Sequence, residues 1–132
     1  MKYATRFVAA LAVLVSTLGC EKTSVEGAGG KKLTLLAPAS QTLKRGETNQ
    51  IAITVTRSNF EDSVAVKFSN LPKGTSVVED KKIDADKNIG TYTIHSGPDA
   101  DLVTNHVAKV TVEGPGGMTA TESFQITVKD KN

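Results

Sequence analysis

The stretch QIAITVTR, residues 50–57, decides the fold class of this chain. Its large apolar residues recur at every second position, at Ile51, Ile53 and Val55, and smaller or polar residues stand between them. Successive side chains of a strand point to opposite faces of a sheet, so a period of two predicts a β-strand with one buried and one solvated face. The apolar positions are β-branched, which favours the same assignment.

Four further stretches repeat this pattern. They are SVAVKFSN at 63–70, TYTIH at 91–95, VAKVTV at 107–112 and ESFQITVK at 122–129. The side chains expected to point inward are Val64, Val66, Phe68, Tyr92, Ile94, Ala108, Val110, Val112, Phe124, Ile126 and Val128. Turn-forming residues separate the stretches, at 71–74, 84–88, 97–99 and 114–117. About seven short strands of this kind predict an all-β fold, an antiparallel β-sandwich over residues 33–130.

The first half of this region also carries a particular order of elements. The turn Gly46-Glu47, a strand at 51–57 that ends on an arginine, the aromatic Phe60, a strand at 64–68 and the turn LPKG at 71–74 follow one another. This order resembles the immunoglobulin-like and fibronectin-III-like β-sandwich modules of bacterial exported proteins. The resemblance implies an immunoglobulin-like sandwich but no particular ligand, because such modules bind different partners. With one cysteine and no tryptophan in the chain, the Cys–Trp–Cys core of antibody domains is not expected.

The first 19 residues have the pattern of a secretory signal peptide. Lys2 and Arg6 precede an apolar run at 7–18, and small residues end it. As a helix this run would span about 18 Å, which is well short of the ~30 Å hydrocarbon core of a bilayer. We therefore expect residues 1–19 to be a removed export signal and not a transmembrane helix.

The single cysteine of the chain, Cys20, follows this signal directly. Behind Leu18 and Gly19 it resembles the lipidated cysteine of bacterial lipoproteins, although Leu18 stands one position nearer the cysteine than in that family. The resemblance implies that Cys20 receives a diacylglycerol and that cleavage before it creates an acylated amino terminus, a stable membrane anchor. Glu21 then implies the outer membrane in a host that has one. The alternative is ordinary cleavage at a small-x-small site, which leaves a secreted protein with a free thiol.

Residues 20–32 are expected to join the anchor to the domain as a flexible tether. The segment EKTSVEGAGGKK at 21–32 is polar, contains three glycines and has neither helical nor strand periodicity. The folded domain is therefore expected to begin near Leu33.

The exported chain is expected to be formally neutral. The whole sequence has 16 Lys and Arg against 14 Asp and Glu, and removal of Lys2 and Arg6 leaves 14 basic side chains against 14 acidic ones. A neutral chain does not bind nucleic acid through bulk charge. The expected partners are the membrane, through the lipid anchor, and an envelope protein or polysaccharide, contacted through loops or a sheet edge.

Two histidines suggest an alternative function. His95 and His106 flank a connection that holds Asp99 and Asp101, and the four side chains could be imagined as a metal site. In an immunoglobulin-like topology, however, the two histidine strands belong to opposite sheets, about 10 Å apart. We therefore expect no metal site and no cofactor. A carrier or sensor of a small ligand or metal that uses His95 and His106 stays open as the alternative.

Other candidate chemistry is weaker. The run Asp84-x-Asp86-x-Asn88 begins like a calcium loop, but it lacks the glycine and the terminal glutamate of an EF-hand, so a turn is expected. The neighbouring carboxylates at 61–62 and 79–80 are also assigned to turns, since neighbours along a strand point to opposite faces. No nucleophile elbow and no phosphate-binding loop occurs in the sequence, and an enzyme is not expected.

The loops divide into two groups if the strands are antiparallel. The turns at 57–62, 84–88 and 114–117 are expected at the tethered end of the domain, and those at 71–74 and 96–105 at the far end. The connection 96–105 is the longest, and long loops on a rigid scaffold often carry recognition. Asp99, Asp101 and Leu102 are therefore the candidate binding residues. The alternative for this loop is that Leu102 and Val103 close the bottom of the core.

Overall fold

The computed structural model describes residues 22–132 of the chain. The expected signal peptide and the lipidation site Cys20 lie outside these residues. Within residues 22–132, no helix is long and apolar enough to cross a membrane.

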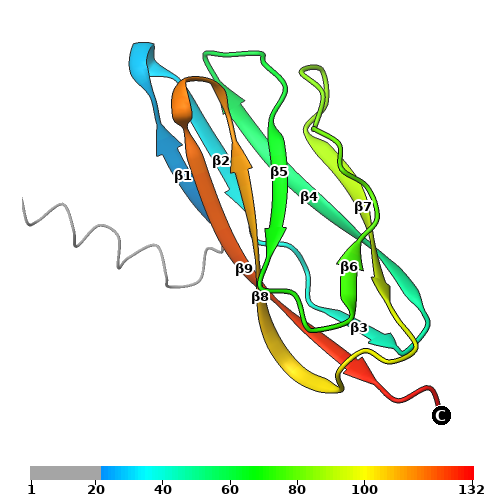
Figure 1. Cartoon of the computed structure of the whole chain (residues 1–132). Helices are drawn as coiled ribbons and strands as arrows, with labels where there is room; N and C mark the ends of the chain where they lie inside the picture. The colour runs from blue at the N-terminus through cyan, green and yellow to red at the C-terminus, as the bar shows by residue number, and fades with distance from the viewer. Residues whose placement is uncertain (1–21) are drawn as a thin grey trace, which may run out of the picture.

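Two β-sheets make up the described chain (Figure 1). The first sheet has the order β1-β2-β4-β7-β6 and the second the order β3-β9-β8-β5. Their strands are β1 (Lys22–Glu26), β2 (Lys32–Leu36), β3 (Gln41–Lys44), β4 (Thr48–Ser58), β5 (Ala65–Ser69), β6 (Thr75–Val77), β7 (Ile89–Ser96), β8 (Val103–Glu113) and β9 (Thr119–Lys129). Short 3-10 turns, η1 (Ala28–Gly30) and η2 (Pro115–Gly117), connect β1 to β2 and β8 to β9. Strands β2-β4-β7-β6 and β5-β8-β9 follow the ABED and CFG order of an immunoglobulin-like β-sandwich, which confirms the expected fold class.

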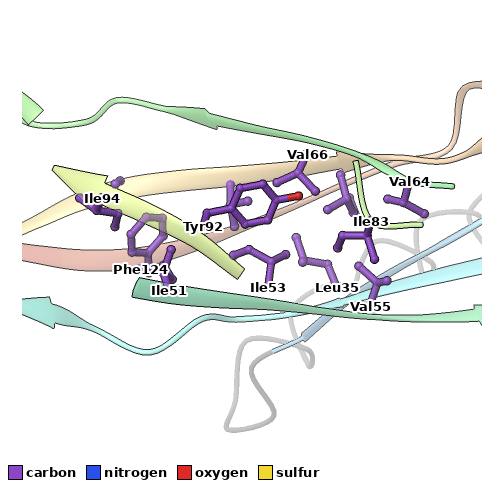
Figure 2. Packing of buried hydrophobic residues seen from close by; sticks show 14 of the residues in the cluster. Leu35, Ile51, Ile53, Val55, Val64, Val66, Ile83, Tyr92, Ile94 and Phe124 are labelled. Atoms are coloured by element: carbon purple, nitrogen blue, oxygen red, sulfur yellow. The ribbon is translucent and has the colours of Figure 1, made fainter. Parts of the chain in front are cut away.

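The alternating residues form the core, as predicted. In strand β4, Ile51, Ile53 and Val55 are each at most 1% exposed. Ala52 and Thr56, on the opposite face, are exposed, and Thr54 is half-buried. The inward residues expected in the other four stretches are all buried, apart from Phe68, which is partly buried against the same cluster. Figure 2 shows part of this cluster, with Ile53, Tyr92 and Val66 among the labelled side chains that meet between the sheets.

Tyr92 occupies the middle of this layer (Figure 2). Its ring meets Phe68 edge-on, with the two ring centroids 5.5 Å apart, and Phe68 in turn meets Phe124 edge-on at 6.2 Å. The Tyr92 hydroxyl donates to the carbonyl of Lys81 at 2.9 Å, and burial raises the pKa of Tyr92 to about 12. These three aromatic side chains thus pack together within the core of a sandwich that has neither a disulfide nor a tryptophan.

The predicted flexible tether is wrong for the residues that the structure describes. Residues 22–26 form β1, which pairs antiparallel with β2, and residues 27–31 are the turn between them. Val25 packs against the core, and the hydroxyls of Ser24 and Thr34 lie 2.8 Å apart across the two strands. The glycines belong to a tight turn, because Gly29 and Gly30 both have a left-handed φ of 76°. The described part of the domain therefore begins at Lys22 and not near Leu33, and it has nine strands where about seven were expected.

The loops group as predicted. Connections 59–64, 84–88 and 114–118 lie at one end of the sandwich together with the β1–β2 turn, and connections 70–74 and 97–102 lie at the other end (Figure 1). The Arg57 side chain ties two of these connections together, 59–64 and 84–88, since it donates to the carbonyls of Asp62, Ile83, Asp84 and Lys87.

The place where the chain enters the sandwich differs from the prediction. Strand β1 runs back along β2 and begins at Lys22 opposite Leu36, the last residue of β2. The turns at 57–62, 84–88 and 114–117 therefore do not lie where the described chain begins. Because β1 runs antiparallel to β2, the described chain begins beside the end of β2 and not beside its start.

Candidate functional site

The connection between β7 and β8, residues 97–102, holds all three candidate binding residues, and we call it the 97–102 loop. Four hydrogen bonds fix its backbone. Gly97 N–H donates to the Gly74 carbonyl at 2.9 Å, Asp101 N–H to the Lys73 carbonyl at 3.0 Å, and Ala100 N–H to the Gly97 carbonyl at 3.2 Å. The fourth comes from Arg45, whose Nε donates to the Ala100 carbonyl at 2.8 Å. The loop is thus tied to two other connections at the same end of the sandwich.

Ala100 closes this end of the core. It is fully buried, and it lies so close to Gly74 that a Cβ added there would be 2.6 Å from the Ala100 Cα. Gly74 also has a φ of 87°, which other residues rarely adopt. The alternative in which Leu102 plugs the core is therefore wrong, because Leu102 is 50% exposed. Val103 does pack against the core, as the first residue of β8.

Apart from the buried Ala100, the side chains of the 97–102 loop face solvent. Asp99 and Asp101 are exposed, as is Leu102, on either side of the buried Ala100. Two carboxylates and an isobutyl group are therefore presented on a fixed backbone. Such a surface can accept hydrogen bonds from hydroxyl, ammonium or guanidinium groups of a ligand and can cover a small apolar surface.

Sequence reasoning missed the residues that hold this loop in place. Arg45 follows β3, and it reaches a carbonyl 55 positions further along the chain. The sequence marks LPKG at 71–74 as a turn, but it does not show that Gly74 of this turn packs against Ala100. The one feature of the sequence that points to this contact is Arg45 itself, which directly precedes the Gly46-Glu47 turn.

The two histidines do not form a joint site. His95 lies on β7 in the first sheet and His106 on β8 in the second, as the topology argument predicted. The Nε2 atom of His106 lies 2.8 Å from the carbonyl oxygen of Asn70, in the connection after β5. In residues 22–132 there is no group of three or more His, Cys, Asp or Glu side chains placed to hold a metal ion.

The run Asp84-x-Asp86-x-Asn88 forms the turn before β7. The guanidinium of Arg57 occupies its inner side, since it donates to the carbonyls of Asp84 and Lys87 at 2.9 and 2.6 Å. Two backbone carbonyls of this turn, and the Asn88 side-chain oxygen at 3.4 Å, are thus already paired with a cationic side chain.

The carboxylate pair Glu79-Asp80 is divided in space. Glu79 accepts hydrogen bonds from the backbone N–H of Thr93 at 2.6 Å and from the Thr93 hydroxyl at 2.7 Å. The Thr93 carbonyl accepts from the backbone N–H of Val78 at 2.9 Å, so the Glu79 carboxylate continues the bonding of β7 beyond the end of β6. The bond from the Thr93 N–H, followed by that from the hydroxyl, lowers the pKa of Glu79 below its usual value of 4.5. Asp80 is exposed.

A shallow notch of about 420 Å³ lies beside β9, where the chain crosses from one sheet to the other. Its walls are residues 37, 38 and 40 of the crossing, Val107 of β8, and residues 122–125 of β9. The one carboxylate in this lining, Glu122, accepts a hydrogen bond from the Thr23 hydroxyl at 2.6 Å. The sequence does not predict the notch, because it predicts neither strand β1 nor the crossing of residues 37–40 from one sheet to the other.

Comparisons with known proteins concern the fold alone. No protein-family model matches the chain, and no curated protein sequence matches it. Among solved structures, the chain is similar to the titin M3 domain, with 13% identity over 70% of this chain and 91% of that domain and a TM-score of 0.43. It is also similar to a chimeric titin Z1Z2 functionalised with a KLER peptide from decorin, with 11% identity over 74% of this chain and 99% of that one and a TM-score of 0.41.

The Glu79 contacts predict an acid-sensitive contribution to stability. Because the pKa is lower in the folded than in the unfolded state, the carboxylate stabilises the fold above pH 4.5 and this contribution is lost as the pH falls through the folded-state pKa. We expect Glu79→Gln to lower the melting temperature at pH 7 and to flatten its decline below pH 4.5. The neighbouring Asp80→Asn is the matched control, expected to follow the unsubstituted chain. Parallel curves for Glu79→Gln and the unsubstituted chain would contradict the assignment.

Proposed function

We propose that this chain is a non-enzymatic, lipid-anchored module of the bacterial cell envelope that binds an envelope protein or polysaccharide through the 97–102 loop. The observation that supports binding is the contrast within this loop. Its backbone is held by four hydrogen bonds, whereas the side chains of Asp99, Asp101 and Leu102 are exposed. A loop that is already ordered loses little conformational entropy when a ligand binds, which favours recognition.

The chemistry of the loop suits a ligand with hydrogen-bond donors. Asp99 and Asp101 offer acceptors on either side of Ala100, as sugar hydroxyls or the basic side chains of a protein would require. A metal or small-ligand carrier built on His95 and His106 is not proposed, because these side chains belong to different sheets.

Membrane attachment is the second part of the proposal. It is supported by the resemblance of the stretch around Cys20 to a lipoprotein signal, and by the neutral charge of the residues after it, which favours a covalent anchor over electrostatic adsorption.

Attachment predicts that Cys20→Ser releases the chain from the membrane without changing its fold. The cysteine precedes β1, so the core and its melting temperature are expected to be unchanged. Detergent-phase partitioning of the two forms, expressed with their export signals, provides the measurement. A serine variant that still enters the detergent phase contradicts the lipid anchor.

Loop recognition predicts that the triple variant Asp99→Ala, Asp101→Ala, Leu102→Ala loses its envelope partner and keeps its stability. Exposed substitutions of this kind usually change stability by no more than about 0.5 kcal/mol. The measurement is photo-crosslinking from a labelled position in the loop in intact envelopes, followed by identification of the crosslinked species.

The matched control for that experiment is Asp84→Ala with Asp86→Ala, which removes two exposed carboxylates at the opposite end of the sandwich. We expect this control to crosslink as the unsubstituted chain does. Unchanged crosslinking in the folded triple variant, or equal loss in the control, rejects the 97–102 loop as the binding surface.

A further inference from the structure

The distance between the lipid anchor and the folded domain is short. Strand β1 begins at Lys22, two residues after Cys20. Two residues span at most about 7 Å in any conformation. If Cys20 carries the lipid, as proposed above, the start of β1 must lie next to the membrane surface. The following inference rests on that proposed anchor.

The start of β1 lies on one long side of the sandwich, away from both loop ends. Lys22 pairs with Leu36 at the end of β2, and the Thr23 hydroxyl bonds Glu122 and the carbonyl of Thr121 on β9, at 2.6 and 3.2 Å. We call this surface, made by β1, residues 36–40, the first half of β9 and the adjoining residues 107–109 of β8, the β1–β9 side. In Figure 1, β1 and β9 run alongside each other, whereas β6 lies across the molecule from them. The sheet order agrees, since β1 and β6 are opposite edges of the first sheet.

The chemistry of the β1–β9 side suits the headgroup region of a bilayer. Leu36 is 39% exposed at its margin and Val107 is 45% exposed in the wall of the notch. Lys22 and Lys109 are exposed beside these two apolar residues, on the same strand pair as Leu36 and the same strand as Val107. Apolar groups flanked by lysines match an interface in which acyl chains begin below a layer of phosphates.

We infer that the β1–β9 side rests on the headgroup region of the bilayer that holds the anchor, so that the sandwich lies on its side. Both loop ends then point along the membrane plane. The opposite edge, with β6, points away from the membrane. The 97–102 loop consequently meets partners beside the protein and not above it.

Two exposed serines allow a matched test of this orientation. Ser123 lies on β9 in the lining of the notch, and Ser76 lies on β6 at the opposite edge. Lipidated Ser123→Cys and Ser76→Cys chains, in which Cys20 is blocked by its lipid, are each labelled with bimane. Each is reconstituted into vesicles of phosphatidylethanolamine and phosphatidylglycerol that contain a nitroxide-headgroup lipid. We expect several-fold stronger quenching of the label at position 123 than at position 76.

An insertion provides the control for the short connection. About 12 Gly and Ser residues placed between Cys20 and Lys22 have a root-mean-square span of about 20 Å. They leave β1 intact, and we expect them to reduce the difference between the two labels. Equal quenching at the two positions in vesicle-bound chains without the insertion overturns the inference and leaves the anchor standing. Chains that fail to float with the vesicles contradict the anchor itself, and the orientation with it.

Discussion

One layer of apolar side chains between two sheets holds this domain together. No intrachain disulfide supports it, because the chain has a single cysteine. The layer contains no tryptophan, and the linked rings of Tyr92, Phe68 and Phe124 fill its centre. A small sandwich with such a core depends on keeping water out at its edges, since apolar burial supplies most of its stability. Polar contacts of Arg57, Glu79 and Thr23 lie at these edges of the core.

The edges are closed by bonds between segments far apart in the chain. Val64 and Ile83 exchange backbone hydrogen bonds at 2.9 Å and so join the two sheets on one side, where Arg57 binds the adjoining carbonyls. Glu79 completes the bonding of Thr93 where β6 ends. On the other side, β1 covers the gap between β2 and β9 through Thr23. The segment nearest the proposed anchor is therefore part of the closure of the core.

The alternation of apolar and polar side chains predicted the features that depend on burial alone, which are the half-buried strands and the fold class. Ile51, Ile53 and Val55 show an alternation that only a half-buried strand requires, and the fold class followed from its recurrence. β1 was missed because KTSVE has a single apolar residue, Val25, and because the glycines after it are as frequent in tethers as in tight turns. Asp99, Asp101 and Leu102 could be placed on an exposed loop. The contact from Arg45 to the carbonyl of Ala100 could not, because every residue has a carbonyl and the sequence does not show which one an arginine will meet.

The claim on which the rest depends is that residues 22–26 are a strand of the domain and not a tether, and amide hydrogen exchange measures this directly. Gly27 N–H bonds the Lys31 carbonyl on the β2 side, so strand alternation directs the N–H groups of Val25 and Thr23 to β2 and those of Ser24 and Glu26 away from it. In the folded, unlipidated Cys20→Ser chain, we expect slow exchange at Thr23 and Val25 and fast exchange at Ser24 and Glu26. Uniformly fast exchange from residue 22 to residue 26, with protection intact in β2, would contradict the account.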